Sequence, residues 1–143
     1  MLTESYPNIN YTIYYKNKEF TGTATCAPED YNYFSSTTGE TIASSRALIK
    51  YLRYVRDNEV KPGYQALKQL YYSMSHSKHF NSKSYEAKML FRQLRIKEEE
   101  LEGIKIQIQR EQSRIKTLIN SLERTKQYIE NKKQIIEKGD NPL

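Results

Sequence analysis

Side chains able to act as nucleophiles, proton donors or metal ligands are few in this chain and widely spaced. Cys26 is the single cysteine, and the two histidines, His76 and His79, lie at least 50 residues downstream. A catalytic thiol needs a neighbouring base to form the thiolate, and a zinc site needs about four ligands. We therefore expect no catalytic residue, no metal site and no cofactor. We predict that Cys26 packs as a small apolar side chain.

Two adjacent carboxylates, Glu29 and Asp30, are further candidates for acid–base chemistry. They follow Pro28 in a stretch rich in turn-forming residues, which predicts a loop, and adjacent side chains on a loop normally point apart into water. The chain also lacks a glycine-rich phosphate loop and the residue order of a Ser-His-Asp triad. We predict that the protein is not an enzyme.

Composition limits the size of the fold and the compartments that it suits. A chain of 143 residues has the length of a single domain. Because 37% of its residues are hydrophobic and 28% are charged, it can build only a modest core. No run approaches the roughly 18 apolar residues of a membrane span, and the N-terminal segment lacks the basic and apolar regions of a signal peptide. We expect a soluble, cytoplasmic protein without a membrane partner.

Two segments near the N-terminus alternate with period two, which is typical of strands. Residues 9–15 place Ile and Tyr on one face, and residues 19–26 place Phe20, Gly22, Ala24 and Cys26 opposite threonines. The connection Lys16-Asn17-Lys18 is short and polar, and Asn tolerates the positive φ of a tight turn. We predict a β-hairpin that must pack on a helix, because two strands alone are marginally stable.

Two helices are expected next. Thr37 and Glu40 have the spacing of a capping box, so a helix should begin near residues 38–41 and end at about Asp57. The residues Lys61-Pro62-Gly63 predict a break in the chain. A second, shorter helix is expected over 64–74, with Ala66, Leu67, Leu70 and Tyr71 as its inner face.

The clearest pattern is a heptad repeat in the C-terminal half. From Ala87 to Ile136 every seventh residue is apolar, which predicts a coiled-coil helix of roughly 55 residues. The predicted oligomer seam consists of Leu94, Leu101, Ile108, Ile115, Leu122 and Ile129. The second seam position is polar in four of seven heptads, which favours short antiparallel packing, a helix folded back on itself, or a groove shared with a partner. Gly103 is the expected bend. We predict a homo-oligomer, with a monomeric folded-back helix pair as the alternative.

The predicted fold class is therefore α+β and mostly helical. It consists of an N-terminal β-hairpin, two short helices, and a long C-terminal coiled-coil helix or helical hairpin. We expect two domains, a small α+β domain over residues 1–80 and the coiled-coil helix over residues 81–143.

A row of basic residues marks the first predicted helix. The net charge of the chain is +6, which favours an acidic partner. The basic stripe, as we name it, comprises Arg46, Lys50, Arg53 and Arg56 with the interleaved Tyr51 and Tyr54. Aromatic rings beside cations can stack on bases while the cations contact phosphates, so this surface is the predicted partner or nucleic-acid binding site. The alternative is an ordinary solvated helix face.

One motif resembles a known group of proteins. The pattern Gly22-x-Ala24-x-Cys26-x-Pro28-x-Asp30, followed by Gly39, Ala43, Arg46 and Ala47, is similar to that of small proteins of phages and prophages of Gram-positive bacteria. There, too, a short β-hairpin leads through a Cys-x-Pro-x-Asp joint into a helix. The resemblance covers about residues 10–60, and Tyr31 departs from the group's pattern.

The resemblance implies a phage accessory protein that acts in the cytoplasm of the host cell. Such proteins often bind and block a host defence machine, so it implies a non-enzymatic inhibitor of, for example, a CRISPR effector, with a host protein or ribonucleoprotein as partner. Two other functions stay open. One is a nucleic-acid or nucleotide-binding module, such as a sponge for immune-signal nucleotides, and the other is a structural or assembly protein of the virion.

The interpretation of Cys26 as a structural residue can be tested by the substitution Cys26→Ser. We expect the free energy of unfolding to fall by about 1–2 kcal/mol, because a hydroxyl replaces a small apolar group. Urea denaturation measures this loss, and partner binding should be unaffected. A variant that unfolds normally but loses binding would make residues 22–30 a working site.

Overall fold

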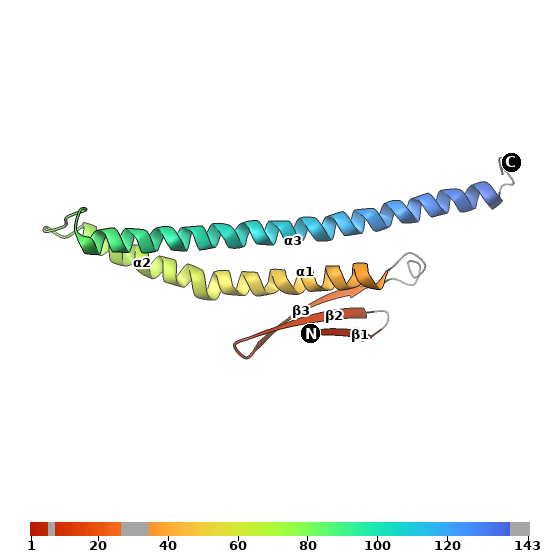
Figure 1. The fold of residues 1–143 in the computed structure, drawn as a ribbon, viewed down its shortest axis with the longest axis horizontal. Coiled ribbons are helices and arrows are strands. Elements are labelled where there is room, and N and C mark those ends of the chain that lie inside the picture. The colour runs from red at the N-terminus through yellow and green to blue at the C-terminus, as the bar shows by residue number, and fades with distance from the viewer. Residues whose placement is uncertain (6–7, 27–34, 138–143) are drawn as a thin grey trace. The chain divides into compact units, whose positions relative to one another are not determined.

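The structure is a computed structural model that describes residues 1–5, 8–26 and 35–137 (Figure 1). The loop carboxylates Glu29 and Asp30, and the motif residues Pro28 and Tyr31, lie outside the described residues.

The N-terminal strands form a three-stranded antiparallel sheet in the order β1-β2-β3, with β1 at Leu2–Ser5, β2 at Asn8–Tyr15 and β3 at Lys18–Thr25. The predicted hairpin is confirmed. Its turn consists of Lys16 and Asn17, whose φ angles of 47° and 62° are both positive, as a type I′ turn requires. Strand β1 was not predicted, because this short strand has little alternation of its own. It pairs with β2 from Leu2 opposite Tyr11 to Ser5 opposite Asn8, and the amide of Thr12 also donates to the carbonyl of Met1, just before β1, at 2.8 Å.

Helix α1 spans Ser36–Val55, so it begins earlier than the expected residues 38–41. The hydroxyl of Ser35 accepts a hydrogen bond from the backbone amide of Thr38 at 3.0 Å, which is the geometry of an N-cap. The capping box built on Thr37 was therefore the wrong choice between neighbouring hydroxyl residues.

The expected break at Lys61-Pro62-Gly63 is also wrong. A single turn of π-helix, η2 at Arg56–Val60, joins α1 directly to α2 at Lys61–Ser75. Pro62 lies in the first turn of α2, where its missing N–H and fixed φ are tolerated. The side-chain amide of Asn58 donates to the carbonyl of Tyr54 at 3.0 Å beside this wider turn. The chain is mostly helical as predicted, but the two helices are neither short nor separated by a loop.

The chain divides into two compact units. Unit 1 consists of Met1–Lys50 and Arg110–Leu143, and unit 2 consists of Tyr51–Gln109. The expected domain boundary at residue 80 lies inside unit 2. Helix α3, at Tyr85–Glu137, contributes to both units and includes Gly103, so the helix is not broken at the expected bend. Its 53 residues correspond to about 80 Å and confirm the long C-terminal helix.

The core of unit 1 lies between the sheet and α1. Ile9 of β2 and Ala24 of β3 are buried with Ile42 and Ala43 of α1, and Tyr11, Ile115 and Leu118 pack against this cluster. The seam residue Ile115 therefore covers the core of its own chain. Figure 1 shows the sheet lying against one side of α1.

Gly22 is the point of closest approach between β3 and α1. A Cβ atom at this position would overlap the carbonyl oxygen of Ala43 and the amide nitrogen of Ala47, and would lie 2.8 Å from the Cβ of Arg46. The two backbones therefore meet without room for any side chain on the strand.

In unit 2, helix α2 pairs with the first turns of α3 in an antiparallel arrangement. Tyr64 donates a hydrogen bond to Glu98 at 3.0 Å. Tyr71 lies two turns further along α2 and Phe91 two turns back along α3, and their ring centroids are 6.4 Å apart. Figure 1 shows the two helices side by side. The half-buried face of α2 is Tyr64, Leu67, Tyr71 and Met74. The expected inner residues Ala66 and Leu70 are exposed instead, with Leu70 at 58%.

Two glycine substitutions test this packing as a matched pair. We expect Gly22→Ala to lower the free energy of unfolding by roughly 1–3 kcal/mol or more, because the new methyl group must push β3 away from α1. Gly103→Ala should instead be neutral or stabilise by up to about 1 kcal/mol, since a Cβ there has no atom within 4 Å and alanine favours the helix. Thermal and urea unfolding measure both. Equal stability of the two variants would contradict the close approach at Gly22.

Candidate functional site

The part of the basic stripe in unit 1 is bound to the sheet. Arg46 donates from Nη1 to the carbonyl of Thr23 at 2.7 Å, and Lys50 donates from Nζ to the carbonyl of Thr21 at 2.6 Å. Because β3 is an edge strand, these carbonyls face away from β2 and need other partners. The two cations therefore complete the edge of the sheet.

The part of the basic stripe in unit 2 is only partly free. Arg56 forms a bidentate pair with Asp57, at 2.8 and 3.2 Å, and Lys61 lies 3.4 Å from the same carboxylate. These hydrogen bonds lower the pKa of Asp57 and raise the pKa of Arg56. Tyr51 and Tyr54 are half-buried, whereas Arg53 is exposed. The predicted row of six residues is thus not a continuous free basic face.

The charge of the chain is concentrated elsewhere in unit 2. Residues 61–97 hold eight lysines and arginines against one acidic residue, Glu86, which gives a net charge of +7 within a chain of net charge +6. The same segment contains four tyrosines and two phenylalanines. A count over each half of the chain hides this cluster, because the acidic run at 98–102 follows directly and the segment straddles the midpoint.

A cavity of about 380 Å³ lies within this segment, and we name it the basic cavity. It is lined by Tyr71, Ser82, Ala87, Lys88, Phe91, Arg92 and Arg95. Lys88, Arg92 and Arg95 recur at spacings of four and three, so they share one face of α3. Within the described part of the chain, none of these three cations forms an ion pair. The cavity therefore presents three positive charges without a carboxylate among its described lining residues.

Aromatic rings form one side of the basic cavity. Tyr71 lies edge-on to Phe80, with ring centroids 6.2 Å apart, and also contacts Phe91 at 6.4 Å with a tilt of 51°. These contacts fix the position of the Tyr71 ring. Phe91 nevertheless remains 56% exposed, beside Lys88 and Arg92 on the same helix. An exposed apolar ring among cations is suited to a ligand that has both a flat apolar part and negative charge.

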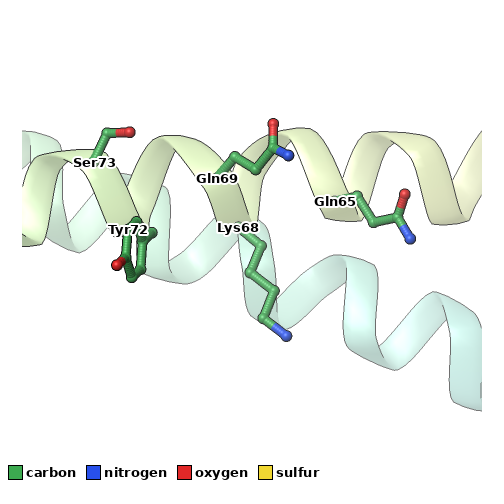
Figure 2. Close-up of a pocket in the computed structure, with 5 residues that line it drawn as sticks. All are labelled: Gln65, Lys68, Gln69, Tyr72 and Ser73. Atoms are coloured by element: carbon green, nitrogen blue, oxygen red, sulfur yellow. The ribbon is translucent and has the colours of Figure 1, made fainter.

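Two other hollows in unit 2 are less suited to an anion. The α2 groove, about 520 Å³, is lined by Gln65, Lys68, Gln69, Tyr72 and Ser73, which all project from one helix (Figure 2). A second hollow of about 360 Å³ mixes Arg56, Lys61 and Lys105 with Glu98 and Glu102, beside Tyr64 and Leu101. There the hydrogen bond to Glu98 raises the pKa of Tyr64. Neither hollow combines several cations with the absence of acidic lining residues.

The residues considered for catalysis are not among those that line the basic cavity. Cys26 is 3% exposed in unit 1, next to the end of β3. His76, in unit 2, stacks on Tyr72 with ring centroids 4.1 Å apart, and its Nδ1 lies 2.8 Å from the carbonyl of the same residue. Over residues 1–5, 8–26 and 35–137, no three His, Cys, Asp or Glu side chains are grouped so as to hold a metal ion. In the same ranges no helix has the length and apolar character needed to cross a membrane.

The predicted oligomer seam is largely covered in the single chain. Leu94 and Ile108 are buried, and Leu101, Ile115, Leu122 and Ile129 are half-buried. Ile136, the last apolar heptad position, is 69% exposed. An isolated helix would expose all of these side chains, but in this chain those of the first heptads are covered, and the homo-oligomer stays a prediction.

Comparison with known proteins gave no relative: no family model, no curated protein and no solved structure matches this chain. The resemblance of residues 10–60 to phage proteins thus stays a prediction. The candidate site rests on geometry alone, and the signal that could have found it is the spacing Lys88-x₃-Arg92-x₂-Arg95 next to Phe91.

The role of Arg46 and Lys50 at the sheet edge gives a stability test. An ordinary solvated helix face, the alternative considered for the basic stripe, would tolerate charge reversal without loss of stability. We now expect the double variant Arg46→Glu, Lys50→Glu to lower the free energy of unfolding by roughly 1–3 kcal/mol, since two charge-assisted hydrogen bonds are lost and carboxylates would face carbonyl oxygens. Arg53→Glu should change it by less than about 0.5 kcal/mol. Urea unfolding in which both proteins match the wild type would refute the edge role.

Proposed function

We propose that this chain is a non-enzymatic, phage-type accessory protein that binds an anionic partner in a host defence machine. The observation that carries the proposal is the basic cavity, where Lys88, Arg92 and Arg95 converge without an ion pair among the described residues. The host context comes from the resemblance of residues 10–60 to phage proteins.

The energetics of the three cations support a binding role. Like charges four residues apart on a helix repel each other and destabilise it by roughly 0.2–0.5 kcal/mol per pair. Lys88 and Arg92 have this spacing, and the single acidic residue of the surrounding segment, Glu86, forms no ion pair with them. A polyanion that neutralises all three charges relieves this repulsion and releases its own counterions.

The arrangement offers binding rather than reaction chemistry. The basic cavity holds cations, two aromatic rings, a serine and an alanine, whereas Cys26 belongs to the other unit. A protein of this kind inhibits a defence complex by occupying the site that its target uses for nucleic acid, or by holding the nucleic acid itself. In both cases the recognition is electrostatic, with long-range steering toward negative charge.

Affinity capture from a bacterial lysate tests this function with a matched control. The site variant carries Lys88→Glu, Arg92→Glu and Arg95→Glu. The control carries Lys116→Glu, Arg124→Glu and Lys133→Glu, which change the net charge equally at exposed positions elsewhere on α3. We expect the wild type and the control to retain the same partner and the site variant to lose it by at least tenfold. Raising the salt from 50 to 200 mM should weaken capture steeply.

Circular dichroism melting of all three proteins shows whether the substitutions act through binding or through folding. If the site variant melts like the control and still captures the same partner, the basic cavity is not the binding site. Repeating the capture after nuclease treatment separates a nucleic-acid partner, whose signal is lost, from an acidic protein surface, whose signal remains.

A further inference from the structure

We infer that the ligand of the basic cavity is a single-stranded nucleic acid, held by its phosphates on Lys88, Arg92 and Arg95 while one unstacked base lies on the ring of Phe91. This inference rests on the proposed function, because it names the partner class of the same cavity. It goes further in assigning a separate role to the aromatic side of the cavity.

The exposure of Phe91 is the first argument. An acidic protein surface needs only the three cations, and it gains little from a half-exposed phenyl ring in their midst. A nucleic-acid strand uses both, because every base has a π-face that stacks on an aromatic side chain while the backbone contacts the cations. Tyr71 supports the Phe91 ring from α2 at 6.4 Å, so the stacking surface is held in place before the ligand arrives.

The spacing along α3 is the second argument. Lys88 and Arg92 are separated by about 6 Å along the helix axis, and Arg95 lies about 4.5 Å beyond Arg92. Neighbouring phosphates of an extended strand are separated by a similar distance, so successive cations can each contact one phosphate. Phe91 lies between the first two cations in the sequence, where a base attached to that stretch of backbone would reach it.

The size of the basic cavity and the charge around it favour a single strand over other forms of nucleic acid. A cavity of about 380 Å³ is near the lower end of ligand pockets and admits roughly one nucleotide, but not a duplex. A paired base is stacked on its neighbours and cannot lie on Phe91. Of the eight cations at residues 61–97, Lys61 and Lys97 pair with Asp57 and Glu100. The other six against Glu86 leave a net charge of +5, more than a single nucleotide can neutralise, which favours a polymer over a free nucleotide of the same chemistry.

Fluorescence anisotropy with a 5′-labelled 12-nucleotide RNA of mixed sequence tests the inference on the full chain. We expect binding whose affinity falls with salt at a slope of about −2, corresponding to three phosphate contacts at about −0.7 each. Phe91→Ala should weaken binding by roughly 5- to 100-fold without changing that slope, because it removes stacking and no charge. Phe91→Trp should restore the affinity. Tyr128→Ala removes an exposed ring beside Lys132 in the other unit and should have no effect.

Competition with unlabelled ligands shows which kind of phosphate-bearing molecule the basic cavity prefers. Unlabelled strand should displace the probe, while a duplex of the same sequence, free adenosine monophosphate, a cyclic dinucleotide and inorganic polyphosphate should each compete at least tenfold less well. Tighter binding of the cyclic dinucleotide or of the duplex would overturn the inference. Equal binding of polyphosphate, together with unchanged affinity of Phe91→Ala, would also overturn it and leave a cavity that recognises charge alone.

The failure of this inference and the failure of the proposed function give different results. If the RNA does not bind, but lysate capture depends on Lys88, Arg92 and Arg95 and survives nuclease, the partner is an acidic protein surface and only the inference fails. If the charge reversal changes neither RNA binding nor capture, both fail.

Discussion

The absence of a side chain at Gly22 is the constraint on which unit 1 depends. It allows the backbone of β3 to approach the carbonyl of Ala43 and the amide of Ala47 directly, without an intervening layer of side chains. At this distance the side chains of Arg46 and Lys50 reach over the strand and bind its outward carbonyls. One close approach therefore both seats the helix on the sheet and satisfies the edge of that sheet.

The same kinds of cationic side chain have different roles because their surroundings differ. Arg46 and Lys50 lie next to carbonyl oxygens of their own chain, which occupy their donors. Lys88, Arg92 and Arg95 have a similar helical spacing, but they lie next to aromatic rings and one another. Donors that lack an internal acceptor are the ones available to a ligand, so the position of acceptors, rather than the number of cations, separates structural from binding charges.

The heptad repeat of helix α3 packs largely against the protein's own chain. An apolar residue at every seventh position suggests an intermolecular coiled coil, yet Ile115 packs on the core of unit 1, and Leu94 is buried within unit 2. A seam of this kind requires only an apolar surface opposite it, and the chain itself provides one along much of the helix. The polar residues at the second seam position are compatible with such irregular partners.

The sequence by itself determined the elements that have local causes. Period-two alternation and the tolerance of Asn17 for positive φ predicted the hairpin, and the heptads predicted the long helix, because both depend on neighbours within a few residues. Local chemistry could not choose Ser35 over Thr37 as the cap, nor show that Pro62 would lie in a first helical turn. Only the tertiary structure decided which cations are free. Arg46 is engaged because an edge carbonyl of a strand 23 residues away lies within its reach. Lys88, Arg92 and Arg95 are available because folding brings Tyr71 beside them and because no described carboxylate lies within ion-pair distance of them.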